Sequence, residues 1–142
     1  MDMDTAKLLL DTNIVSYLFK KSDYARPYYQ HLAGKLLFLS FITVGEIFLW
    51  AESSGWGQKR RAELEERLHN YSIIPYDHEI ARSYARIAAE RKRSGRPISL
   101  HDAWIAACAV RHAIPLVTHN PKDFESIASL EIITKTAGNQ LS

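Results

Sequence analysis

Residues 7–13 have the sequence KLLLDTN, and this stretch decides the fold class of the chain. Its three consecutive leucines predict a short strand buried on both faces, because a strand with one exposed face would alternate apolar and polar residues. The chain turns at Asp11, and residues 14–20 then carry apolar side chains at helical spacing. A buried strand that leads directly into a helix is typical of a parallel sheet covered by helices.

The alternation of strands and helices continues along the chain. Further short strands are expected at residues 36–39, 72–74, 116–118 and 131–133, and helices at residues 42–53, 58–70, 78–93 and 100–112. The helix at 42–53 is apolar on nearly every side, so we expect it to be buried. The sequence therefore predicts one three-layer α/β/α domain over residues 1–142, with a short, mainly parallel central sheet and a flexible tail at residues 137–142.

The composition of the chain limits the classes of protein to which it can belong. The chain has 142 residues, 46% of them hydrophobic, which is enough to bury a core without disulfides or a structural metal. Its 18 basic and 16 acidic residues leave a net charge of +2, so charge alone does not identify a nucleic-acid-binding protein. The single cysteine, Cys108, cannot form an internal disulfide, which favours a reducing compartment, by default the cytoplasm. The longest mostly apolar run, residues 36–51, is too short to span a membrane, and no membrane or export signal is expected.

Three acidic residues stand alone in apolar surroundings. They are Asp11, the only charged residue in 8–19, Glu46, the only one in 36–51, and Asp102, the only carboxylate in 97–110. Burying an ionised carboxylate without a partner costs several kcal/mol, so each acid needs compensation. No lysine or arginine lies in the first two windows, and next to Asp102 there is only His101.

A divalent cation is one partner that would satisfy all three acids. Mg²⁺ and Mn²⁺ prefer oxygen ligands, and reactive groups in parallel sheets gather at the carboxyl ends of the strands. A fourth acid, Asp123, follows the strand expected at 116–118 and is the weakest candidate. The pattern predicts one shared metal site.

Simpler interpretations of the same residues remain open. Asp11 and Asp102 could each cap the helix that follows, and Asp123 could cap a turn. Glu46 has no capping role, and a purely structural explanation would require a buried arginine partner. His101 and His119 lack the paired spacing of a zinc motif and are interpreted as packing or surface residues.

Four motifs resemble those of the PIN-domain ribonucleases, and in particular the toxins of VapC-like toxin–antitoxin pairs. They are LLLDTN at 8–13, TVGEI at 43–47, SLHDAWIAA at 99–107 and LVTHNPKDF at 116–124. Each motif alone is weak, but the four occur in the family's order over nearly the whole chain. Each one also delivers an acid that the charge argument had already singled out.

The resemblance implies a fold, a ligand set and an activity. The fold is a five-stranded, Rossmann-like sheet in which Asp11, Glu46, Asp102 and Asp123 are catalytic and surround one or two Mg²⁺ or Mn²⁺ ions. Supporting polar positions are matched by Asn13, Thr118 and Asn120, although some members carry a further Asp where Asn120 stands. The implied activity is metal-dependent endoribonuclease cleavage, in which a metal-activated water attacks phosphorus and leaves a 5′-phosphate.

The resemblance also implies partners: an RNA substrate, a cognate antitoxin and a second copy of the chain. The first 60 residues hold more aromatic side chains than one small core can bury, so some are expected to form an exposed contact surface. On the helix at 78–93, the stripe of Arg82, Arg86 and Arg93 could follow an RNA backbone or be an ordinary solvated face.

Three other functions compete with the toxin. A phosphatase with an Asp nucleophile would carry a second Asp two residues after Asp11, where this chain has Asn13. A PIN-fold nuclease of RNA processing would use the same site for another purpose. A non-catalytic RNA-binding or interaction module would not need the four acids.

Overall fold

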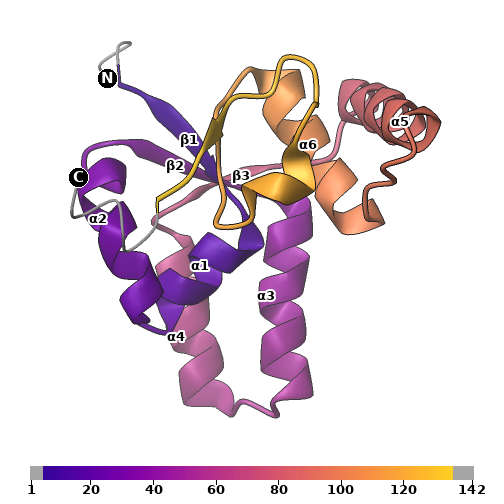
Figure 1. The fold of residues 1–142 in the computed structure, drawn as a ribbon. Coiled ribbons are helices and arrows are strands. Elements are labelled where there is room, and N and C mark those ends of the chain that lie inside the picture. The colour runs from indigo at the N-terminus through magenta and orange to yellow at the C-terminus, as the bar shows by residue number, and fades with distance from the viewer. Residues whose placement is uncertain (1–4, 136–142) are drawn as a thin grey trace.

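The computed structural model describes residues 5–135, and these residues build a sheet of five parallel strands (Figure 1). The strands are β1 (Lys7–Leu10), β2 (Leu36–Ser40), β3 (Ser72–Ile74), β4 (Leu116–Val117) and β5 (Ile132–Ile133). All four pairings are parallel, in the order β3-β2-β1-β4-β5. The predicted strands are confirmed to within about one residue. The flexible tail expected at 137–142 lies outside the described residues.

Helices connect the strands as the sequence predicts. They are α1 (Thr12–Phe19), η1 (Asp23–Ala25), α2 (Arg26–Leu32), α3 (Phe41–Ser53), α4 (Gln58–Leu68), α5 (His78–Arg93), α6 (Leu100–His112) and η2 (Pro121–Phe124), where η marks a 3-10 helix. The helix α2 was not predicted. It is only seven residues long and has a proline in its first turn, so it shows no extended helical periodicity. None of the helices in residues 5–135 has the length and apolar character that a membrane crossing requires.

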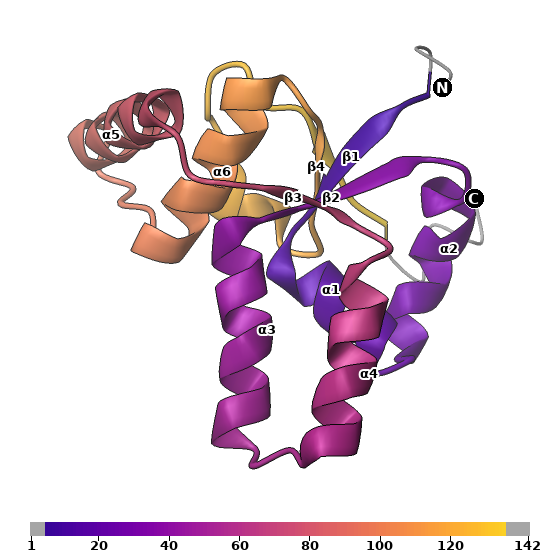
Figure 2. The same cartoon turned by 180° about the vertical axis from the view of Figure 1, so that it is seen from behind.

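The strand β1 is buried on both faces and so separates two apolar layers. Leu9 packs with residues of α5, α6 and η2, whereas Leu8 and Leu10 pack with residues of α1, α2, α3 and α4. All three leucines are buried, because consecutive strand residues point to opposite faces. Figure 2 shows the two groups of helices on opposite sides of the sheet. The three-layer arrangement is confirmed.

The strand order reverses at β1, and this reversal positions the site. From β1 the chain moves outward through β2 and β3, and later returns to place β4 on the other side of β1. In parallel sheets, ligands bind in the crevice outside the carboxyl ends of the strands at such a switch point. The N–H of Asp11 donates to the carbonyl of Val117 (2.9 Å), which fixes the ends of β1 and β4 side by side.

The helix α3 is not buried, contrary to the expectation from its apolar sequence. It extends beyond the sheet and pairs with α4 in a projecting helical hairpin (Figures 1 and 2). Thr43, Ile47 and Ala51 are buried, but Phe48 is exposed and Leu49 is 55% exposed. The residues that meet the core lie mostly in its first turns, and the rest of the helix projects past the edge of the sheet.

Arg91, on the inner side of α5, is a buried arginine that ties three segments together. Its Nε donates to the carbonyl of Arg96 (2.7 Å), and its Nη1 donates to the carbonyls of Asp123 and Glu125 (3.2 Å each). No acidic side chain in residues 5–135 pairs with it. The guanidinium therefore holds η2, and with it Asp123, against α5 through backbone carbonyls.

We expect the Arg91→Ala variant to lose about 3 kcal/mol of unfolding free energy, because three carbonyls lose a charged donor at a buried position. Urea denaturation measures the loss. The Arg93→Ala variant is the matched control, since Arg93 lies on the same helix and makes only an exposed pair with Glu90. Its cost should be at most about 0.5 kcal/mol. Equal effects of the two substitutions would contradict the bracing role of Arg91.

Candidate active site

Asp11 lies at the carboxyl end of β1 and has both carboxylate oxygens engaged. Its Oδ1 accepts from the backbone N–H of Thr12 (2.8 Å) and so caps α1. Its Oδ2 accepts from the hydroxyl of Thr118 (2.7 Å), which follows β4. Asp11 is only 5% exposed. The capping interpretation is therefore correct for one oxygen, while the other oxygen bridges two strand ends.

Burial has the largest effect on the pKa of Asp11. Desolvation raises the pKa of its carboxyl above the ordinary value of 3.8, and the hydrogen bonds from Thr118 and Thr12 oppose this rise. The negative charge of Asp102 raises the pKa further, whereas His101 lowers it. Asp102 and His101 therefore lie within electrostatic reach of Asp11, although they come from a different helix.

The loop after β4 surrounds Asp11 with polar groups. The backbone N–H of Asn120 donates to the Thr118 hydroxyl (3.1 Å), which in turn donates to Asp11. The backbone N–H of His119 donates to the side-chain oxygen of Asn13 (3.3 Å). The three residues named as supporting polar positions thus all lie in this network around Asp11.

The first turn of α6 brings Asp102 to the same crevice. The cap of α6 is Ser99, whose hydroxyl accepts from the N–H of Asp102 (3.1 Å). The capping interpretation of Asp102 is therefore wrong: the helix already begins at Leu100, and the Asp102 side chain is not needed there. It remains 21% exposed, and one oxygen lies 3.5 Å from Nδ1 of His101.

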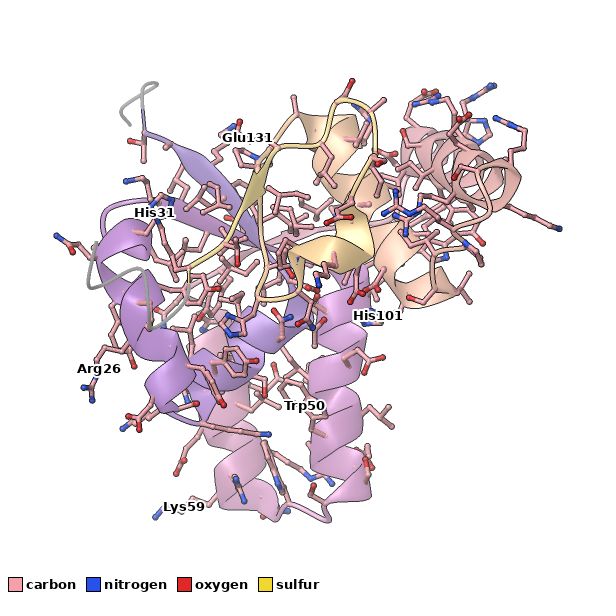
Figure 3. The ribbon with its side chains drawn as sticks, in the orientation of Figure 1. Arg26, His31, Trp50, Lys59, His101 and Glu131 are labelled. Atoms are coloured by element: carbon pink, nitrogen blue, oxygen red, sulfur yellow. The ribbon has the colours of Figure 1, made fainter. Side chains whose placement is uncertain are left out.

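His101 joins Asp102 to Glu46, the acid supplied by α3. The His101 Nε2 lies 3.7 Å from Oε1 of Glu46, and Figure 3 shows His101 where α6 begins beside α3. Glu46 is 36% exposed at its side chain and has a histidine, not a buried arginine, as its partner. The prediction that His101 is only a packing or surface residue does not account for its position between two acids. The position of His101 next to Asp102 in the sequence indicates a contact with that acid. Its contact with Glu46 cannot be seen in the sequence, because it depends on how α3 and α6 pack.

The charge on His101 is coupled to both acids. The hydrogen-bonding contact with Asp102 raises the pKa of His101, burial lowers it, and the nearby charges of Glu46 and Asp102 raise it again. The net direction is upward, which favours the protonated imidazole. A protonated His101 then compensates part of the negative charge in the crevice.

The donor chemistry of these acids fits a hard divalent cation, but their arrangement is not a finished ligand shell. Within residues 5–135, no three acidic, histidine or cysteine side chains are grouped closely enough to hold a metal ion together. Glu46 and Asp102 are turned toward His101. The three carboxylates lie in one region of the structure without sharing a common point.

Asp123 is placed differently from the other three acids. It lies in η2 and is exposed. Its backbone carbonyl accepts from Arg91, and within the described part of the chain its carboxylate pairs with no other side chain. The loop that carries it is anchored to Asp11 through Asn120 and Thr118, so η2 lies next to the other candidate residues.

The basic stripe of α5 is largely paired. Arg82 lies 3.6 Å from Glu79, and Arg93 lies 2.7 Å from Glu90. Arg86 contacts the hydroxyl of Ser83. These pairs within one helix favour the interpretation of the stripe as a solvated surface.

Comparisons with known proteins agree with this architecture. The family model of the PIN domain matches residues 8–130. The chain is 34% identical over 129 residues to Ribonuclease VapC2 of Haemophilus influenzae, which covers 87% of this chain and 94% of that protein. It is 31% identical over 125 residues to the tRNA(fMet)-specific endonuclease VapC of Shigella flexneri, with 87% and 94% covered.

Solved structures give the same result. VapBC2 from Rickettsia felis, bound to a DNA fragment from its promoter, has a TM-score of 0.80 at 25% identity and covers 92% of this chain and 99% of that one. VapBC-1 from nontypeable Haemophilus influenzae has a TM-score of 0.78 at 32% identity, with 90% and 97% covered.

In chelating buffer at pH 7, we expect Asp11→Asn to be as stable as the parent or more stable. Burial raises the pKa of the Asp11 carboxyl in the folded protein above its value in the unfolded chain. The contribution of Asp11 to the free energy of unfolding is therefore complete below the unfolded-state pKa and is lost as the pH rises through the folded-state pKa. The parent should therefore lose stability relative to the variant across that window, as urea unfolding at several pH values can show. The exposed Asp23→Asn is the control. An Asp11→Asn protein that is less stable than the parent at neutral pH would contradict this account.

Proposed function

The chain belongs to the PIN-domain family and groups with its VapC ribonucleases, and from this membership and its site we propose that it is an endoribonuclease, the toxin of a toxin–antitoxin pair. The observation that carries the proposal is the grouping of acids at the strand reversal. There a buried Asp11 meets acids supplied by two separate helices, α3 and α6. The proposed substrate is RNA, because the similar proteins are a ribonuclease and a tRNA(fMet)-specific endonuclease.

We propose that Mg²⁺ or Mn²⁺ is the cofactor and that Asp11, Glu46 and Asp102 are its ligands, with Asp123 as a fourth acid. Support comes from the all-carboxylate donor set, because such cations select oxygen ligands. When bound, the cation supplies positive charge for the phosphoryl group and a more acidic water. Cys108, the single cysteine, is buried in the core and cannot contribute.

Each residue of the crevice has a separate task in this proposal. Thr118 and the N–H of Thr12 orient the Asp11 carboxylate and favour its ionised form against the effect of burial. Glu46 is the most exposed of the three converging acids, so it can orient an attacking water or accept its proton. His101 holds Glu46 and Asp102 near each other by its charge when no cation is present.

The competing functions differ from the toxin in specific ways. A non-catalytic module does not need acids from α3 and α6 placed close to the buried Asp11. An RNA-processing nuclease would share the chemistry, and only the presence of an antitoxin partner distinguishes it. The phosphatase is disfavoured because Asn13, which stands where its second acid would be, accepts a hydrogen bond from His119 in the loop after β4.

The purified protein is expected to cleave single-stranded or looped RNA with Mg²⁺ or Mn²⁺ and to be inactive in excess EDTA. Loss of one ligand should lower the cleavage rate by about 100-fold or more, so Asp102→Asn and Glu46→Gln are the test variants. Glu52→Gln is the matched control, because Glu52 is an exposed acid on the same helix as Glu46 and pairs with Arg61. Gel analysis of end-labelled RNA gives the rates. Full cleavage in chelator would refute the metal requirement.

We propose two protein partners, an antitoxin and a second copy of the chain. A solved structure similar to this chain is a toxin–antitoxin complex from Klebsiella pneumoniae, and others are VapBC structures. The projecting hairpin of α3 and α4 exposes Phe48 and Leu49, and α2 exposes Tyr29. Exposed apolar side chains on a projecting element are a typical contact surface.

From its native locus, the protein should be isolated as a dimer bound to a small second protein. The Phe48→Asp/Leu49→Asp double variant should weaken at least one of these assemblies, because it places charge on the exposed apolar side of α3. Light scattering and co-purification measure the outcome. Ile73→Asp, at an exposed apolar residue on the edge strand β3, is the control. A monomeric parent without any co-purifying protein would contradict the proposal.

A further inference from the structure

Three aromatic rings from different parts of the chain meet beside Asp11. They are Tyr17 on α1, Tyr24 on η1 and His119 in the loop after β4, and we call them the aromatic shelf. The ring centroids are 5.2 Å apart for Tyr17 and Tyr24, 5.3 Å for Tyr17 and His119, and 5.6 Å for Tyr24 and His119. Each ring therefore contacts the other two.

The shelf is fixed rigidly to the candidate active site. His119 directly follows Thr118, which donates to Asp11, and its backbone N–H donates to Asn13. Its ring is held from below by the buried Tyr28, whose hydroxyl lies 2.7 Å from Nδ1 of His119. That hydroxyl is itself fixed by the backbone of Lys135, to whose carbonyl it donates (2.9 Å).

The shelf is partly open to solvent, and its rings are inclined to one another by 34° to 88° instead of lying in one plane. Tyr24 is 61% exposed, and Tyr17 and His119 are half-buried. The N–H of Tyr24 donates to the Ser22 hydroxyl (3.1 Å), which caps η1 and fixes the backbone that carries this ring. Burial, the neighbours Tyr24 and Tyr28, and finally the charge of Asp11 raise the pKa of Tyr17, so the shelf lies within electrostatic reach of the site.

We propose that the aromatic shelf stacks one unpaired base of the RNA substrate next to the scissile phosphate, with Tyr24 as its main contact. This inference rests on the proposed ribonuclease function. An aromatic ring accepts any base face, and stacking of this kind is how proteins hold single-stranded nucleic acid. A base in a duplex has its faces covered by its neighbours, so the shelf selects single-stranded or looped RNA.

The position of the shelf next to the candidate acids favours a nucleobase over other ligands. The shelf adjoins Asp11 because His119 directly follows Thr118, which donates to Asp11, so a ligand on the shelf lies next to the proposed metal site. The phenolic hydroxyl of Tyr24 and the ring of His119 add polar edges that can face a nucleobase. A buried core role does not explain Tyr24, because its side chain is mostly outside the core.

The test compares Tyr24→Ala with Tyr24→Phe, which keeps the ring. Binding of a fluorescently labelled single-stranded RNA oligonucleotide is measured by anisotropy in EDTA, where nothing is cleaved. We expect Tyr24→Ala to raise Kd about 10-fold and Tyr24→Phe to leave it within about twofold of the parent. Tyr76→Ala, at a comparably exposed tyrosine (56%) between β3 and α5, should leave Kd unchanged.

A series of oligonucleotides with one abasic position, moved along the strand, locates the stacked base. When the abasic position is the one next to the cut, the parent should bind about 10-fold more weakly. The affinity of Tyr24→Ala should not change with an abasic site at that position. With Mg²⁺, the same substitution should raise KM about 10-fold. If Tyr24→Ala matches the parent in Kd, KM and abasic profile, the inference is wrong while the proposed ribonuclease stands. If the parent neither binds nor cleaves RNA, the proposed function itself fails.

Discussion

The hydrogen bond from the Thr118 hydroxyl to the Asp11 carboxylate joins the carboxyl ends of β1 and β4 where the strand order reverses. Asp11 sits there because KLLLDTN places an acid directly after a strand buried on both faces, so the carboxylate cannot move out to solvent. The loop after β4, with Asn120 and His119, is organised around this bond. The aromatic shelf and η2 take their positions from that loop.

Burying Asp11 opposes folding, and the surrounding residues limit that cost. The raised pKa of Asp11 shows that its hydrogen bonds do not fully replace water. His101, between Glu46 and Asp102, supplies a positive charge at the same crevice. Ionisable groups whose burial is only partly compensated are common at functional sites. A group whose hydrogen bonds and charge are fully compensated in the free protein has little to gain from a ligand.

Much of this architecture could be predicted from the sequence because its strands are short runs buried on both faces. Residues whose surroundings depend on packing could not. The apolar sequence of α3 does not show that half of its surface lies beyond the sheet, so its predicted burial was wrong. Asp102 resembles a helix cap until Ser99 is seen in that role. The acids at 11, 46 and 102 were picked out by their isolation, but the contact between His101 and Glu46 joins residues 55 positions apart.

Helix α3 carries both a candidate site residue and the exposed apolar side chains. Glu46 faces the crevice, and Phe48 and Leu49, two and three residues further on, face solvent. A helix turns once in about 3.6 residues and rises about 5.4 Å in doing so, so these side chains all belong to a single turn. Leu49, three residues after Glu46, is its neighbour on the helix surface, whereas Phe48, two residues after it, lies on nearly the opposite side. A partner that covers Leu49 therefore lies next to an acid proposed to hold the metal. Because α3 projects from the sheet, such a partner can reach Glu46 without disturbing the core that positions Asp11.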